Sequence, residues 1–183
     1  LSGDAMLVLA YQFMAECPST FLKEVMDLFS LTALEICEGQ QMDMEFEQRN
    51  DVTAEEYLEM IRLKTAVLLA ASLKIGARLG GTSVEDADRL YDFGMHIGVA
   101  FQLKDDLLDV YGNAKVFGKN IGGDILCNKK TYMLIKALEH ANADQHNQLN
   151  SWINAETFQP AEKIAAVTEL YDRIGVKAVC ENK

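Results

Sequence analysis

The stretch Phe101-Gln102-Leu103-Lys104-Asp105-Asp106-Leu107-Leu108-Asp109 is the most informative segment of this chain for both fold class and chemistry. It lies in a proline-free segment, 84–111, whose apolar residues recur at helical spacing. At about 100° per residue, one quarter of the helical wheel carries the following residues, with Asp106 at its edge: Gly94, Gly98, Phe101, Gln102, Asp105 and Asp109. The pattern predicts a long helix with one face that changes from bare backbone to carboxylates.

The carboxylates of this face allow two interpretations. Carboxylates on successive helical turns repel each other unless a cation lies between them, and Mg²⁺ usually binds one or two protein carboxylates together with phosphate oxygens and waters. Asp105, Asp106 and Asp109 are therefore candidate ligands for a magnesium ion that bridges to a diphosphate. The alternative is an acidic helix face in water, and the motif alone does not exclude it.

The presence of two glycines inside this predicted helix also needs a structural explanation. Gly94 and Gly98 each destabilise a helix interior by about 1 kcal/mol relative to alanine. Their presence predicts either close packing of a neighbouring helix or room for an apolar ligand.

Composition favours an all-α fold and excludes several partners. The 183 residues are 49% hydrophobic and include only two prolines, so we expect one packed helical domain, 1–183. The net charge of −11 opposes nucleic acid and anionic lipid surfaces. No apolar run approaches the roughly 18 residues of an integral membrane segment. The four cysteines form no C-x-x-C pair, which favours a reducing, cytoplasmic setting over a zinc site or a disulfide framework.

Capping residues, glycines and prolines indicate where the helices begin and end. Helices are expected at roughly 3–16, 20–49, 54–79, 84–111, 129–141, 144–155 and 160–181. Thr53 with Glu56, and Thr82 with Glu85, have the form of capping boxes. The segment 112–128 holds four of the twelve glycines and interrupts the helical pattern, so it is a candidate functional loop. Because the chain enters a helical pattern at its first residues, we expect it to be truncated at the N-terminus. A truncated C-terminus is the second possibility.

Further polar residues lie where phosphate chemistry could use them. Lys64 shares an apolar stripe with Met60 and Leu68, so we expect it to have an anionic partner, although a lysine there could also extend to the surface. Thr65 could donate a hydrogen bond to the same anion. The remaining candidates either bind ligand or are solvated polar side chains: Gln40 and Asp43 on helix 20–49, and Lys119 and Lys129 around the glycine-rich loop.

Taken in order, these segments resemble the trans-polyprenyl diphosphate synthases, the family of farnesyl and geranylgeranyl diphosphate synthases. The resemblance rests on five segments: 39–43 (GQQMD), 64–65 (KT), 101–109 (FQLKDDLLD), 118–119 (GK) and 124–131 (DILCNKKT). Gly3-Asp4 also looks like the segment that follows the first aspartate-rich motif of the family. The resemblance covers residues 3 to about 135.

The resemblance implies an isoprenoid-synthase helical bundle around a central cavity, usually in a homodimer. It implies that isopentenyl diphosphate condenses with an allylic diphosphate by ionisation, condensation and elimination. Asp105, Asp106 and Asp109 would form the second aspartate-rich motif, whose carboxylates reach Mg²⁺ on the allylic diphosphate. By the same resemblance, Lys64 and Lys119 would bind the allylic diphosphate, and Thr65 and Gln102 would orient the reacting groups. Phe101 and Lys129 would line the isopentenyl diphosphate side of the site. Gln40 and Asp43 would lie near the allylic chain and the metal shell.

The first aspartate-rich motif and the basic motif upstream of it are not among the 183 residues. We therefore expect this polypeptide alone to be inactive. Two alternatives stay open: a non-catalytic subunit that tunes a partner's product length, and a terpene cyclase or head-to-head condensing enzyme on the same fold.

Overall fold

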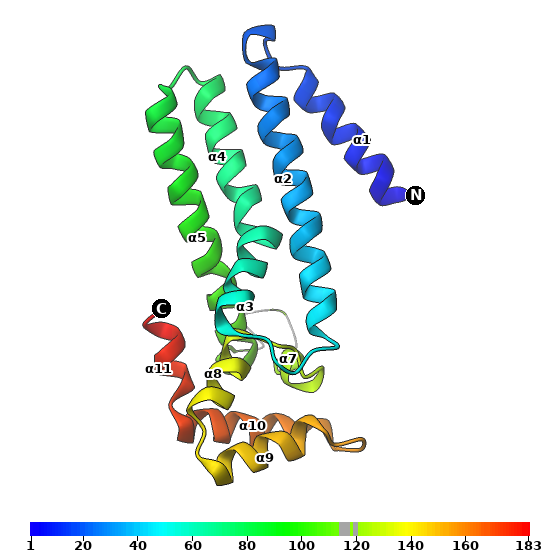
Figure 1. Cartoon of the computed structure of the whole chain (residues 1–183), viewed down its shortest axis with the longest axis vertical. Coiled ribbons are helices and arrows are strands. Elements are labelled where there is room, and N and C mark those ends of the chain that lie inside the picture. Colours follow the sequence, from blue (N-terminus) through cyan, green and yellow to red (C-terminus); the bar gives the residue numbers. More distant parts are fainter. Residues whose placement is uncertain (114–117, 119–120) are drawn as a thin grey trace. The chain divides into compact units, whose positions relative to one another are not determined.

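The computed structural model describes residues 1–113, 118 and 121–183, and these residues form helices and no strands (Figure 1). The expected all-α fold class is confirmed. The helices of the first half are α1 Ser2–Ala15, α2 Ser19–Phe46, α3 Ala54–Ile61, the π-helical η1 Arg62–Ala66, α4 Val67–Leu79 and α5 Val84–Tyr111. Those of the second half are α7 Gly123–Leu126, α8 Tyr132–His140, α9 Ala143–Ile153, α10 Pro160–Ile174 and α11 Val176–Glu181.

Contacts divide the chain into two compact units. Unit 1 contains residues 1–43 and 59–99, and unit 2 contains residues 44–58 and 100–183. Helices α2, α3 and α5 each contribute to both units.

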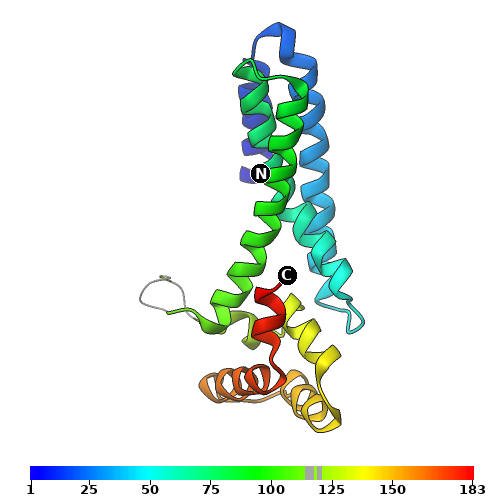
Figure 2. The same cartoon turned by 90° about the vertical axis from the view of Figure 1, so that its left-hand side faces the viewer.

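Unit 2 is built around α10, which contacts α7, α8, α9 and α11 (Figure 2). Its core includes Tyr57, Met133, Leu149 and Tyr171, none of which exposes more than 3% of its surface. Thr131 caps α8 by accepting a hydrogen bond from the amide of Leu134 at 3.3 Å. The aspartate motif enters this unit on the last turns of α5.

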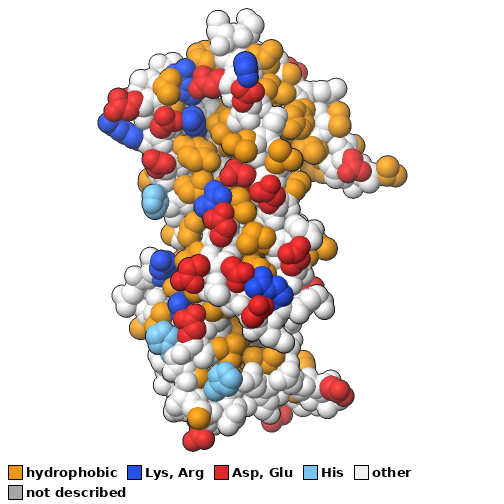
Figure 3. Space-filling model, viewed as in Figure 1, with side chains coloured by type: hydrophobic (Ala, Val, Ile, Leu, Met, Phe, Trp, Pro, Cys, Tyr) orange, Lys and Arg blue, Asp and Glu red, His pale blue; other side chains and the backbone are white. Residues whose placement is uncertain are grey.

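Charge and apolar surface are both visible on the outside of the molecule. Carboxylates are spread over the face shown in Figure 3 rather than gathered in one patch. Helix α1 contributes no buried residue to unit 1 and leaves Met6, Val8 and Phe13 more than half exposed. In the part of the chain that the structure describes, no helix is long and apolar enough to cross a bilayer.

Glycines let three helical segments of unit 1 approach at backbone distance. A Cβ atom on Gly39 of α2 would clash with the backbone nitrogen of Lys64 in η1. On the other side, Cβ atoms on Gly94 and Gly98 of α5 would each lie 2.6 Å from a Cα atom, that of Ala70 and that of Ala66 respectively. The two glycines of α5 therefore serve close helix packing, which decides between the two possibilities that the sequence left open.

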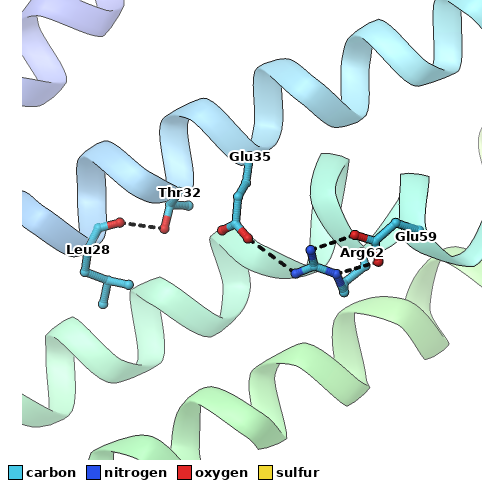
Figure 4. A network of polar contacts seen from close by, with 5 residues as sticks. All are labelled: Leu28, Thr32, Glu35, Glu59 and Arg62. Carbon is cyan, nitrogen blue, oxygen red and sulfur yellow. Dashed lines mark hydrogen bonds and ion pairs between the residues drawn. The ribbon is translucent and has the colours of Figure 1, made fainter.

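Ion pairs reinforce this packing at the edges. Arg62 of η1 lies 3.4 Å from Glu35 of α2 and donates two hydrogen bonds of 2.8 Å to Glu59 of α3 (Figure 4). The bond from Arg62 holds the pKa of Glu59 below its usual range. Thr32, one turn from Glu35, donates to the backbone carbonyl of Leu28 at 2.8 Å.

The segment that carries Lys64 is a single π-helical turn. The amide of Val67 bonds to the carbonyl of Arg62, five residues back, instead of the usual four. Such turns are rare and often occur at functional sites. This turn places Lys64 and Thr65 between two α-helical runs, α3 and α4.

Several predicted boundaries are corrected by the structure. Helix 20–49 ends at Phe46, α7 was not expected, and helix 160–181 is divided at Gly175, whose φ of +83° a non-glycine residue rarely adopts. The Thr53–Glu56 capping box is confirmed by hydrogen bonds of 2.8 and 3.1 Å. The Thr82–Glu85 box is wrong, because the amide of Thr82 still bonds to Ala77 and the start of α5 is capped by Ser83.

The glycine contacts predict opposite effects for two equivalent substitutions. Gly98→Ala should lower the free energy of unfolding of the intact protein by roughly 1–3 kcal/mol, because its methyl group meets the backbone of Ala66. Gly76→Ala on α4, where no atom lies within 4 Å of the added Cβ, should raise it by about 0.5–1 kcal/mol. Urea titration measures both, and equal shifts for the two variants would contradict the packing described.

Candidate functional site

Asp106 is the most deeply buried carboxylate of the aspartate motif. It exposes 2% of its surface, and the hydroxyl of Tyr57 donates a 2.5 Å hydrogen bond to its Oδ2 atom. Among the described residues, its Oδ1 atom has no hydrogen-bond partner. Burial raises the pKa of Asp106 to about 7, and the bond from Tyr57 offsets only part of that effect. The motif thus contains a buried carboxylate with one oxygen held by Tyr57 and the other without a hydrogen-bond partner in the described part of the chain.

Asp109 ties the motif to the segment that follows the glycine-rich loop. Its Oδ2 atom accepts from the amide of Asp124 at 3.0 Å, and its carbonyl accepts from the amide of Gly122 at 2.6 Å. Asp105 and Asp109 are both partly exposed, unlike Asp106. The three aspartates therefore have three different environments, although the sequence assigns them one motif.

A carboxylate and a lysine of the next segment form an ion pair. Lys129 Nζ lies 3.4 Å from Asp124 Oδ1, and the amide of Lys129 donates to the carbonyl of Asp124 at 3.0 Å. Burial raises the pKa of Asp124, and the charge of Lys129 opposes this rise. Asp106, Asp124 and Lys129 all line one small cavity of about 20 Å³ in unit 2, which has room for about one water molecule.

These side chains fit a magnesium ion that arrives with a diphosphate. Within residues 1–113, 118 and 121–183, no three His, Cys, Asp or Glu side chains converge on one point as a complete metal site would require. Mg²⁺ does not need such a cage, since one or two carboxylates suffice when phosphate and water complete its octahedron. The unpartnered Oδ1 of Asp106 and the partly exposed carboxylates of Asp105 and Asp109 supply donors of the right chemistry.

Unit 1 contains a second group of candidate residues. Lys64 Nζ lies 2.7 Å from Asp43 Oδ2, and both side chains are partly exposed. The expectation that Lys64 has an anionic partner is confirmed, and that partner is itself a candidate residue. Thr65 is half-buried beside Lys64, whereas Gln40 is exposed on α2.

The remaining candidates differ in exposure. Phe101 leaves 62% of its surface exposed, as Phe13 and Phe93 do to a similar degree, and Gln102 is half-buried. Lys119 lies outside the described residues.

Comparisons with known proteins agree with the sequence motifs. The family profile described as polyprenyl synthetase matches residues 1–171. The chain belongs to the polyprenyl synthetase family. It is 40% identical over 176 residues to a short chain isoprenyl diphosphate synthase from Methanothermobacter thermautotrophicus, which covers 96% of this chain and 53% of that protein. The chain thus spans about half the length of the curated relatives that it matches.

Solved structures of polyprenyl synthetases superpose closely on this chain. A geranylgeranyl pyrophosphate synthase with 40% identity has a TM-score of 0.93 over 100% of this chain and 57% of its own. The geranylgeranyl pyrophosphate synthase of Corynebacterium glutamicum, complexed with isoprenyl diphosphate and magnesium, has 31% identity and a TM-score of 0.87 over 98% of this chain and 52% of its own.

The sequence reasoning missed two residues beside the aspartate motif: Tyr57, which donates to Asp106, and Lys163, which lines the same cavity as Asp106. Tyr57 gave no signal, because a tyrosine on a buried helix face is ordinarily a core residue. Lys163 did give one, since it shares a helical stripe with Val167 and Leu170, the pattern that singled out Lys64. Asp124, the first residue of the segment 124–131, forms an ion pair with Lys129 that the sequence did not predict.

The raised pKa of Asp106 predicts a pH-dependent stability in the intact, metal-free protein. The folded state favours the protonated carboxyl, so this stabilisation is complete below about pH 3.8 and is lost as the pH rises through about 7. Between pH 4.5 and 7.5, with EDTA present, wild type should therefore lose roughly 2–4 kcal/mol of unfolding free energy relative to Asp106→Asn. Parallel stability curves for the two proteins would contradict this assignment.

Proposed function

We propose that the intact protein is a trans-prenyltransferase that condenses isopentenyl diphosphate with an allylic diphosphate and releases a longer polyprenyl diphosphate. The observation that carries the proposal is the arrangement at the end of α5. A buried aspartate with one unpartnered oxygen lines the same cavity as the Asp124–Lys129 pair. Acidic donors beside a lysine suit a diphosphate that is bound together with a divalent cation.

The aspartate motif would hold Mg²⁺. Asp105, Asp106 and Asp109 supply the carboxylates, and the bond from Tyr57 fixes the orientation of Asp106. When bound, the ion would supply positive charge that stabilises the diphosphate leaving group. Because Asp106 is otherwise desolvated, a cation nearby would also favour its ionised form.

Lys64 and Lys119 would bind the allylic diphosphate, Thr65 would help to orient the reacting groups, and Gln40 and Asp43 would lie near the allylic chain and the metal shell. Lys64 is already paired with Asp43, so its ammonium group is held in place before a phosphate oxygen arrives. The proposed reaction begins when the allylic carbon–oxygen bond breaks and the diphosphate takes the electron pair. Cationic side chains that stabilise this developing negative charge lower the barrier.

Phe101 and Lys129 would serve the isopentenyl diphosphate, and Gln102 would orient the reacting groups. The double bond of isopentenyl diphosphate attacks the allylic cation, and a proton then leaves to the departed diphosphate, so that a new trans double bond forms. The exposed face of Phe101 could stabilise the cation, because an aromatic ring attracts positive charge.

We also propose that the intact protein is a cytoplasmic homodimer. The apolar surface of α1 would pack against a second subunit. Its side chains Met6, Val8 and Phe13 are exposed, and none of the residues of this helix is buried.

The direct test supplies isopentenyl diphosphate and Mg²⁺ to the intact protein with dimethylallyl, geranyl or farnesyl diphosphate in separate reactions. Mass spectrometry after dephosphorylation should show chains longer by multiples of five carbons, and EDTA should abolish them. Failure to elongate any primer would overturn the proposal. Cyclised or head-to-head products would assign the chain to the other chemistry of this fold.

A substitution in the aspartate motif should separate catalysis from folding. Asp105→Ala in the intact protein should lower kcat by at least about 100-fold, because it removes a ligand of the proposed ion that stabilises the leaving diphosphate. The matched control is Asp92→Ala, an exposed aspartate on the same helix, which should keep wild-type turnover. Circular dichroism checks that both variants are folded, and wild-type turnover in Asp105→Ala would refute the assignment.

A further inference from the structure

Lys163 on α10 is a buried lysine with an unusual environment. It exposes 1% of its surface, although lysine is almost never fully buried unless it is paired. In the described part of the chain, no carboxylate forms an ion pair with it. Its Nζ atom donates a 2.7 Å hydrogen bond to Asn128 Oδ1 and lies 4.3 Å from the centroid of the Phe158 ring. Burial lowers the pKa of Lys163. Without its hydrogen bond, this buried ammonium group would destabilise the folded state.

The acceptor, Asn128, has the backbone conformation that most side chains avoid. Its φ of +52° makes it the one non-glycine residue with positive φ among those that the structure describes. Two helices hold its side chain: Nδ2 donates to the carbonyl of Ile153 at the end of α9 at 3.0 Å, and Oδ1 accepts from Lys163 of α10. Asparagine tolerates the left-handed region, and these two bonds fix it there.

The left-handed residue closes the turn that carries the ion pair of the site. The amide of Asn128 bonds to the carbonyl of Ile125 at 3.2 Å, and the next amide, that of Lys129, bonds to the carbonyl of Asp124 at 3.0 Å. The side chains of Asp124 and Lys129 are thereby brought to 3.4 Å. Lys163 lines the same cavity as both of them and as Asp106.

We propose that Lys163 is a positioning residue that acts through Asn128. Its buried ammonium holds the Asn128 side chain, which keeps the turn at 124–129 closed and presents Lys129 to the diphosphate of the substrate. This role rests on the proposed function, since Lys129 is the residue that would meet isopentenyl diphosphate. The hydrogen bond that links Lys163 to the turn is independent of that function.

Steady-state kinetics of the intact protein tests the role. Lys163→Met removes the charge and keeps the length of the side chain, so KM for isopentenyl diphosphate should rise about 10-fold or more, as expected for loss of a buried hydrogen bond to a charged group. KM for the allylic diphosphate and kcat should stay within about 2-fold, since Lys129 would serve one substrate only. Lys23→Met is the control, because that side chain is 87% exposed and lies on α2.

Asn128→Gly supplies an independent variant, because glycine keeps the left-handed backbone and removes the acceptor. It should raise the same KM, and the double variant Lys163→Met/Asn128→Gly should be no worse than the more affected single variant. If Lys163→Met does not fold, Asn128→Gly carries the test by itself. Multiplicative effects, an unchanged KM, or a loss confined to kcat would overturn the proposal.

Amide hydrogen exchange distinguishes failure of this inference from failure of the proposed function. Even if the protein elongates no primer, Lys163→Met should speed exchange of the amides of residues 124–131, and Lys23→Met should not. Calorimetry with isopentenyl diphosphate alone, without an allylic primer, should then show binding weakened about 10-fold in Lys163→Met. Unchanged protection of this segment would overturn the role of Lys163 whatever the enzyme does.

Discussion

Removal of the Asp106 carboxylate from water is the constraint on which unit 2 depends. A buried carboxylate needs hydrogen-bond donors or positive charge nearby, and the fold supplies one donor, Tyr57, from the middle of α3. The charge of Lys129, brought close by the turn that follows the glycine-rich loop, lowers the pKa of Asp106 against the effect of burial. The hydrogen bond and the positive charge together do not compensate fully for burial, because the Oδ1 atom of Asp106 has no hydrogen-bond partner among the residues that the structure describes and the pKa of Asp106 stays raised. Such a group gains from a cation, which is what a metal-dependent site requires.

Unit 1 depends on a different constraint, the backbone contact of α2 and α5 with the segment between them. Because Gly39, Gly94 and Gly98 have no side chains, η1 and the start of α4 can lie against both neighbouring helices. The π-helical turn lies at this contact and carries Lys64, whose ammonium group is paired with Asp43 on α2. The same glycines therefore allow the close helix packing and place the candidate residue Lys64 beside Asp43.

The sequence predicted what periodicity and residue type determine. Helical spacing indicated α5 and its carboxylate face, and an apolar stripe indicated that Lys64 needs an anion. Periodicity could not indicate the π-helical turn, because one extra residue per turn changes hydrogen bonding without a distinct residue pattern. It also could not place the Tyr57–Asp106 bond, which joins residues 49 positions apart. The Asp124–Lys129 pair was missed because it depends on one left-handed residue, Asn128.

The most direct test of this account is the position of a divalent cation on α5. Crystals of the intact protein grown with Mn²⁺ and inorganic diphosphate would reveal the ion by its anomalous scattering. We expect a peak within about 2.0–2.3 Å of a carboxylate oxygen of Asp105, Asp106 or Asp109 and in contact with the diphosphate. Diphosphate bound with no metal peak near any of these carboxylates would contradict it.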